Sequence, residues 1–123
     1  RIGLSISRDL RFTNRLTTIR NGEDTTGKLA QIVVSEGIDT VVVGLPRNLN
    51  GEDTSQTEVV RKFVAELEDN IKAIVVLQDE ADTSNLARER LKSQGLNDRQ
   101  VEEEVDAEAA VIILEDYLSE QRT

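Results

Sequence analysis

The sequence predicts a three-layer α/β domain with a mixed β-sheet between layers of helices. Short apolar runs of strand length alternate with longer segments that have the apolar spacing of amphipathic helices. Two of the runs, within residues 38–45 and 73–77, contain uninterrupted apolar stretches, as is typical of parallel strands covered on both faces. Nearly all apolar side chains are aliphatic, with only two Phe and one Tyr in 123 residues. Because it has only 123 residues, the whole chain is expected to form one domain.

The first twenty residues predict antiparallel strands. Residues 1–7 place Ile2, Leu4 and Ile6 in alternation with small or polar residues, which predicts a half-buried strand. Because this pattern is already present at the first residue, we expect a few residues to be missing upstream. The Thr-rich residues 12–19 predict one or two short strands that pair with the first.

The remaining chain predicts strand–helix–strand units, which require right-handed parallel crossovers. Ser55-Gln56-Thr57-Glu58 has the form of a capping box, and Gly37 and Gly95 are suited to end helices. The expected helices cover residues 26–36, 55–69, 83–94 and 98–120, and the expected strands cover residues 38–45 and 73–77.

Composition excludes several kinds of chemistry. The chain has no Cys and no His, which excludes disulfides, thiolate or imidazole zinc sites, and Ser-His-Asp or Cys-His nucleophiles. Carboxylates remain, and they bind hard cations such as Mg²⁺, Mn²⁺ or Ca²⁺. No apolar run approaches the roughly 18 residues that a membrane helix needs, and the first residues do not have the pattern of a signal peptide. We therefore expect a soluble, cytoplasmic protein.

The net charge of −9 argues at first against a nucleic-acid partner. The charge is uneven, however, because residues 1–20 carry five Arg against one Asp, whereas residues 97–123 carry nine acids against two Arg. Bound divalent cations and the basic first segment would make a working surface less negative than the total charge implies. Nucleic-acid binding therefore stays open, and we expect it to be weak and strongly metal-dependent.

Two candidate features follow the predicted parallel strands. The Gly44-Leu45-Pro46 turn ends one strand and the Asp79-Glu80 pair ends the next, so we expect them to be neighbours at the carboxyl edge of the sheet. Asp106 is a third candidate, since it shares a helix face with apolar residues. Carboxylates that a strand end and a helix bring together are suited to bind Mg²⁺. The simpler explanations are that Asp79-Glu80 forms a solvated turn and that Asp106 is an acid at the margin of an apolar helix face.

Two further segments offer donors for phosphate or sugar groups. The loop after Pro46 begins with Arg47 and Asn48, and the Arg-rich first segment begins with Arg1. The structural alternatives are a polar surface loop and solubilising charges on a sheet edge.

Taken together, four segments resemble the YqgF/RuvX family over essentially the whole chain. These are bacterial proteins of the RNase H-like fold, related to Holliday junction resolvases. The segments are Arg1-Ile2-Gly3-Leu4-Ser5-Ile6-Ser7, Val42-Val43-Gly44-Leu45-Pro46 with Gly51, Asp79-Glu80, and Val105-Asp106-x-x-Ala109-Ala110 followed by Ile112-Ile113-Leu114-x-x-Tyr117-Leu118.

The resemblance implies a mixed five-stranded sheet flanked by helices and a Mg²⁺- or Mn²⁺-dependent nuclease. The implied substrate is structured RNA, with maturation of the 5′ end of the small-subunit ribosomal RNA precursor as the role, or branched DNA. Glu80 and Asp106 match the family's central and C-terminal acids, as catalytic metal ligands. The family's first catalytic Asp would precede Arg1. The expected substrate-binding residues are Arg1, Gly44, Arg47 and Asn48. We also expect that the protein does not bind a membrane and that it forms a homodimer.

Two other classes of function stay open. One is a catalytically degenerate RNase H-like module that binds nucleic acid or a protein partner without cleavage. Ala81 and Ala107 favour it, because they stand where the family usually has Arg and Lys. The other is a small-ligand domain of the flavodoxin or nucleotide-binding kind, which would lack the expected Gly-rich first loop.

Overall fold

The computed structural model describes residues 1–122, which form two compact units. One unit combines Arg1–Arg20 with the chain from Asp82 onward, and we call it the split unit. The other is Asn21–Ala81, the continuous unit. No helix within residues 1–122 is both long and apolar enough to cross a membrane.

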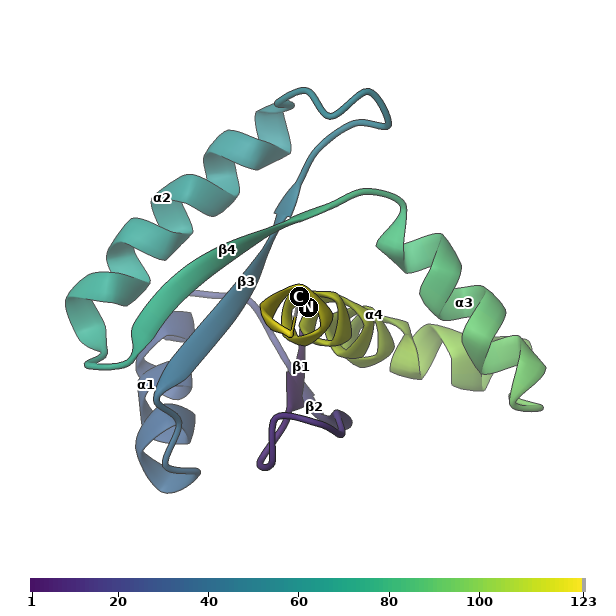
Figure 1. Ribbon diagram of the computed structural model, residues 1–123, viewed down its shortest axis with the longest axis horizontal. Helices are drawn as coiled ribbons and strands as arrows, with labels where there is room; N and C mark the ends of the chain where they lie inside the picture. Colours follow the sequence, from purple (N-terminus) through teal and green to yellow (C-terminus); the bar gives the residue numbers. More distant parts are fainter. Residues whose placement is uncertain (123) are drawn as a thin grey trace. The chain divides into compact units, whose positions relative to one another are not determined.

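The split unit packs two helices and a β-hairpin around an aliphatic core. Strands β1 (Ile2–Ile6) and β2 (Asn14–Ile19) pair antiparallel, and helices α3 (Thr83–Ser93) and α4 (Asp98–Gln121) pack together (Figure 1). Helix α4 also packs against both strands. The buried side chains at the centre are Ala87, Leu91, Val101, Val105 and Ile112.

The continuous unit is a strand–helix–strand arrangement with one preceding helix. Strands β3 (Thr40–Pro46) and β4 (Ile74–Glu80) lie side by side and parallel, and helix α2 (Ser55–Asn70) connects them (Figure 1). Helix α1 (Thr25–Ser35) precedes β3 and packs against α2. Leu67 and Val64 of α2 and Leu45 of β3 are buried in this unit.

The structure confirms each predicted helix to within one residue at either end. Strand β4 is longer than predicted and includes Asp79 and Glu80, because the register with β3 continues through the pair Pro46 and Glu80. The capping box begins one residue earlier than predicted: the N-cap of α2 is Thr54, whose backbone N–H donates to the Thr57 hydroxyl at 2.8 Å.

The prediction of one five-stranded sheet is wrong for the described residues, which contain two sheets of two strands each. Residues 12–19 supply a single strand, β2. The three valines of β3 are half-buried, where the sequence predicted burial on both faces. The physical reason is that apolar alternation indicates that a segment is a strand, whereas strand pairing is decided by contacts between residues distant in sequence.

Candidate active site

The carboxyl ends of β3 and β4 bring together the two strand-end motifs, as the sequence predicted. In the parallel register, Gly44 pairs with Gln78, Leu45 with Asp79, and Pro46 with Glu80. The backbone N–H of Arg47 then donates to the Glu80 carbonyl at 3.1 Å, which continues the pairing one step beyond β3. Gly44, Arg47 and Glu80 therefore meet at one edge of this two-stranded sheet.

Arg47 links this sheet edge to the loop that follows it. Its Nε lies 3.0 Å from Asp79 Oδ1, and its Nη1 forms a short ion pair with Asp53. The hydrogen bond to Asp79 raises the pKa of Arg47, against a smaller lowering by burial, and the charges of Asp79 and Asp53 raise it further. Its third nitrogen, Nη2, has no partner within residues 1–122. The guanidinium thus retains N–H groups that can donate to a phosphate.

Asn48 shapes the loop with its side-chain oxygen. That oxygen accepts from the backbone N–H groups of Asn50 at 3.0 Å and Glu52 at 2.9 Å. Gly51 completes the turn with a φ of +79°, a conformation that side chains disfavour. The turn uses the Asn48 oxygen, whereas the donor that the sequence predicted for substrate contact is the side-chain NH₂ group, 3.4 Å from Glu52 Oε1.

Thr57 fixes the end of β3 to the start of α2. It is fully buried, and its hydroxyl donates to the Pro46 carbonyl at 2.5 Å. Because Pro46 also pairs with Glu80, this hydrogen bond supports the strand end that carries the acidic pair.

The two acids of the Asp79-Glu80 pair differ in their surroundings. The Asp79 side chain is 70% exposed and is held by Arg47. Glu80 is half-buried, and its carboxylate has no hydrogen bond or ion pair within residues 1–122. An unpartnered carboxylate beside a polar strand end is suited to bind a cation.

Asp106 belongs to the split unit, on the part of α4 that covers β1. Its Oδ2 lies 2.9 Å from Arg1 Nε, and Arg1 Nη2 also donates to the Glu102 carbonyl at 2.7 Å. The Asp106 side chain is one-third exposed. Ala107, next to it, is buried. The structure therefore brings Arg1 to Asp106 in the split unit and Arg47 to Glu80 in the continuous unit, which also holds Gly44 and Asn48.

The donor set fits a hard divalent cation in its chemistry. Glu80 and Asp106 offer carboxylate oxygens, the ligands that Mg²⁺ and Mn²⁺ prefer, and the Glu80 carboxylate is free of protein partners in the described chain. Among residues 1–122, no group of three or more acids gathers closely enough to hold a metal.

Several residues that shape the site had no signal in the sequence. Asp53 contacts Arg47 and Thr57 contacts Pro46 across a loop. Asp79 was found from its place after a strand, but its contact with Arg47, 32 positions away, had no local signal. Only the residues at the ends of apolar strands could be found from sequence, because contact between strand ends is the rule in parallel sheets.

Comparisons with known proteins match this chain to the same group of proteins over nearly its whole length. The family model described as RuvX, Holliday junction resolvase, matches residues 1–120. A protein of Chloroflexus aurantiacus is 37% identical, covering 100% of this chain and 82% of the relative. One of Maridesulfovibrio salexigens is 36% identical, and one of Dehalococcoides mccartyi is 33% identical; each covers 97% of this chain and 90% of the relative. All three are named "Putative pre-16S rRNA nuclease".

These matches place the chain, with its mixed helices and strands, in a family of nucleases, which are hydrolases of phosphodiester bonds. More specifically, the chain belongs to the RuvX family of Holliday junction resolvases.

Proposed function

We propose that the protein is a divalent-metal-dependent nuclease that processes the 5′ end of the small-subunit ribosomal RNA precursor. The observation that carries the proposal is the half-buried, unpartnered carboxylate of Glu80, held beside Arg47 at a parallel strand end in a chain of this family. The printed names of the three relatives support RNA as the substrate. Branched DNA is the alternative substrate, in keeping with the description of the family.

Glu80 and Asp106 are the proposed catalytic residues and metal ligands. A bound Mg²⁺ or Mn²⁺ would supply an acidified water and neutralise charge on the departing oxygen. Carboxylate oxygens hold such an ion, and the Asp106 carboxylate lies beside the Arg1 guanidinium, with its Oδ2 2.9 Å from Arg1 Nε.

The proposed substrate contacts are Arg1, Gly44, Arg47 and Asn48. Arg47 is preorganised, because Asp79 and Asp53 hold it while Nη2 remains available for a phosphate oxygen. Gly44 leaves the backbone open to close approach, since it has no side chain. For Asn48 the remaining donor is its side-chain NH₂ group, whose contact with Glu52 is long, at 3.4 Å.

Family membership also supports an RNase H-like fold in a single domain. We further propose that the protein acts in the cytoplasm, where ribosomal RNA of bacteria matures, and that it forms a homodimer.

The decisive experiment compares conservative variants of the two acids. Glu80→Gln and Asp106→Asn should each lower cleavage of a precursor ribosomal RNA fragment by at least about 100-fold with Mn²⁺ or Mg²⁺ present, since each removes a charged ligand. Glu68→Gln and Asp69→Asn are matched controls, because both acids are exposed on α2 and should leave the rate unchanged. A four-way DNA junction assayed in parallel distinguishes the two substrates. Cleavage of both substrates at the wild-type rate by Glu80→Gln would contradict the mechanism.

A second candidate is a module that binds RNA without cleaving it. It is favoured by the ion pair between Arg1 and Asp106, which neutralises a proposed ligand. This module would bind the precursor RNA with unchanged affinity after Glu80→Gln. It would cleave the RNA neither with Mg²⁺ nor with Mn²⁺.

A further inference from the structure

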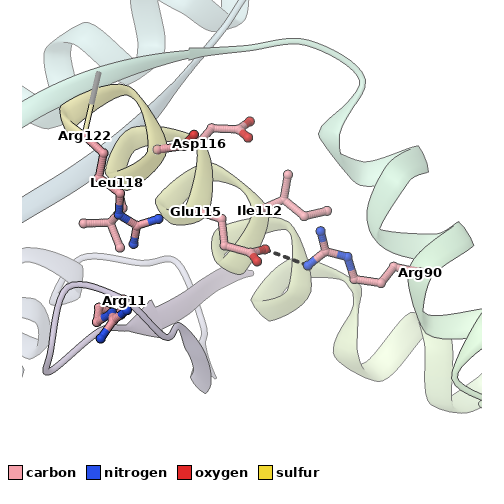
Figure 2. A pocket seen from close by; sticks show the side chains of 8 residues that line it. Arg11, Arg90, Ile112, Glu115, Asp116, Leu118 and Arg122 are labelled. Atoms are coloured by element: carbon pink, nitrogen blue, oxygen red, sulfur yellow. Dashed lines mark hydrogen bonds and ion pairs between the residues drawn. The ribbon is translucent and has the colours of Figure 1, made fainter.

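The split unit contains a second place suited to a ligand. A groove of about 330 Å³ lies between the loop after β1, the last turns of α4 and one side chain of α3 (Figure 2). Arg11 comes from the loop, Arg90 from α3, and Glu115 and Asp116 from α4, which Arg122 directly follows. None of these residues belongs to the candidate active site.

The loop beside the groove is held in one conformation. Asp9 Oδ1 accepts from the backbone N–H groups of Arg11 at 3.0 Å and Phe12 at 2.9 Å, and these two hydrogen bonds lower the pKa of Asp9. Leu10 has a left-handed backbone with a φ of 63°. The Arg122 guanidinium donates to the Leu10 carbonyl at 2.8 Å, which ties the loop to the end of α4. The loop is therefore a built feature, because a strained residue persists only where its surroundings fix it.

This fixed loop displays large apolar side chains to water. Phe12 is 72% exposed and Leu10 is 66% exposed. Phe12 is one of only two Phe in the chain, so one of its few aromatic rings is kept outside the core. An exposed ring on a preorganised loop can stack on another flat ring.

Three arginines and two acids line the groove, and the arginines differ in how they are paired. Arg90 forms an ion pair with Glu115 at 2.7 Å (Figure 2) and another with Glu108 at 3.2 Å. Within residues 1–122, neither Arg11 nor Arg122 forms an ion pair with a carboxylate, although the charge of Arg11 acts on nearby Asp9. Asp116 is a second acid in the lining and opposes an anionic ligand. Arg11 and Arg122 therefore offer N–H donors near the exposed ring of Phe12.

We propose that this loop and groove bind a single-stranded segment of the RNA substrate, with Phe12 stacking on an unpaired base and Arg11 and Arg122 contacting phosphates. The proposal rests on the proposed nuclease function and adds a second contact region to it. The two exposed apolar residues, Leu10 and Phe12, flank Arg11 in the sequence, so a cation lies next to the exposed ring. A base and its phosphate match this alternation of ring and cation.

Binding is measured by fluorescence anisotropy with a labelled single-stranded RNA of about 12 nucleotides and a blunt RNA duplex of the same length, in EDTA. Phe12→Leu should weaken single-strand binding by about 5- to 100-fold, because stacking contributes roughly 1–3 kcal/mol per base. Arg11→Gln should weaken binding and lower the salt-dependence slope by about one. Asp116→Asn should strengthen binding. Arg99→Gln is the matched control, because Arg99 is 88% exposed on the same unit and lies outside the groove.

The outcomes separate this inference from the proposed function. Equal single-strand affinity of wild type, Phe12→Leu and Arg11→Gln overturns the inference, even when wild-type protein cleaves precursor RNA. Absence of single-strand binding by the wild type also overturns it and points to a protein partner for the loop. Phe12-dependent binding by a protein that cleaves no RNA upholds the inference and contradicts the nuclease. Circular dichroism verifies that each variant is folded.

Discussion

Gly3 of β1 lies directly against the backbone of Asp106 in α4. A Cβ added to Gly3 would lie 2.0 Å from the Asp106 carbonyl carbon and 2.3 Å from the Ala107 nitrogen. Both atoms belong to the helix backbone, which cannot rotate away as a side chain would. The position of a proposed catalytic acid therefore depends on the missing side chain of a residue more than a hundred positions earlier.

Gly3→Ala is expected to destabilise the protein by about 2–3 kcal/mol, at the upper end of overpacking changes, because α4 must move away from β1. It should also lower nuclease activity through displacement of Asp106. Urea unfolding measures the first effect. Gly22→Ala is the matched control, since a Cβ there meets nothing within 4 Å. Equal stability of Gly3→Ala and Gly22→Ala would show that the contact is not tight.

Thr57→Val should destabilise the continuous unit by roughly 1–2 kcal/mol. The substitution keeps the shape of the buried side chain but removes the hydroxyl that donates to the Pro46 carbonyl and accepts from Thr54. Thermal unfolding provides the measurement. Thr17→Val, at an exposed position of β2, should be close to neutral. A Thr57→Val protein as stable as the wild type would argue against the hydrogen-bonded tie.

Glu108→Gln should destabilise the split unit by roughly 1–3 kcal/mol. Glu108 is 5% exposed, and Arg90 at 3.2 Å and Arg15 at 3.7 Å lie beside its carboxylate. Loss of the buried charge leaves these guanidinium groups poorly compensated. Chemical denaturation tests this expectation, with Glu103→Gln on the exposed side of α4 as the control. The prediction fails when both variants unfold at the same denaturant concentration.

The acid Asp116 should give a stability effect that depends on pH. Burial raises the pKa of Asp116, and the charges of Glu120 and Glu115 raise it further. Because the pKa is higher in the folded state, the carboxylate opposes folding once pH exceeds the unfolded-state pKa, and this cost is complete above the folded-state pKa. Asp116→Asn should therefore slightly raise the melting temperature near neutral pH, and the gain should shrink as pH falls toward the ordinary range of an aspartate. Asp69→Asn, on exposed α2, should show no such trend.

Local sequence patterns were sufficient for the helices and for the neighbouring strand ends. The apolar spacing of α2 and α4 and the aliphatic runs of β3 and β4 carry that information themselves. The pairing of strands into two separate sheets was not predictable, since it depends on which distant segments meet. The same limit applies to the site: Glu80 was found from its place after an apolar run, whereas the engagement of Asp79 by Arg47 and of Asp106 by Arg1 required coordinates.

The division of the chain between its units has a consequence for synthesis on the ribosome. The continuous unit ends at Ala81, so all of its strands and helices are available once that residue has emerged. Strands β1 and β2 are made before the continuous unit, yet the helix that covers them, α4, is made after it. These two strands therefore wait for a much later segment, and loop closure over this long separation should make the split unit the slower of the two to fold.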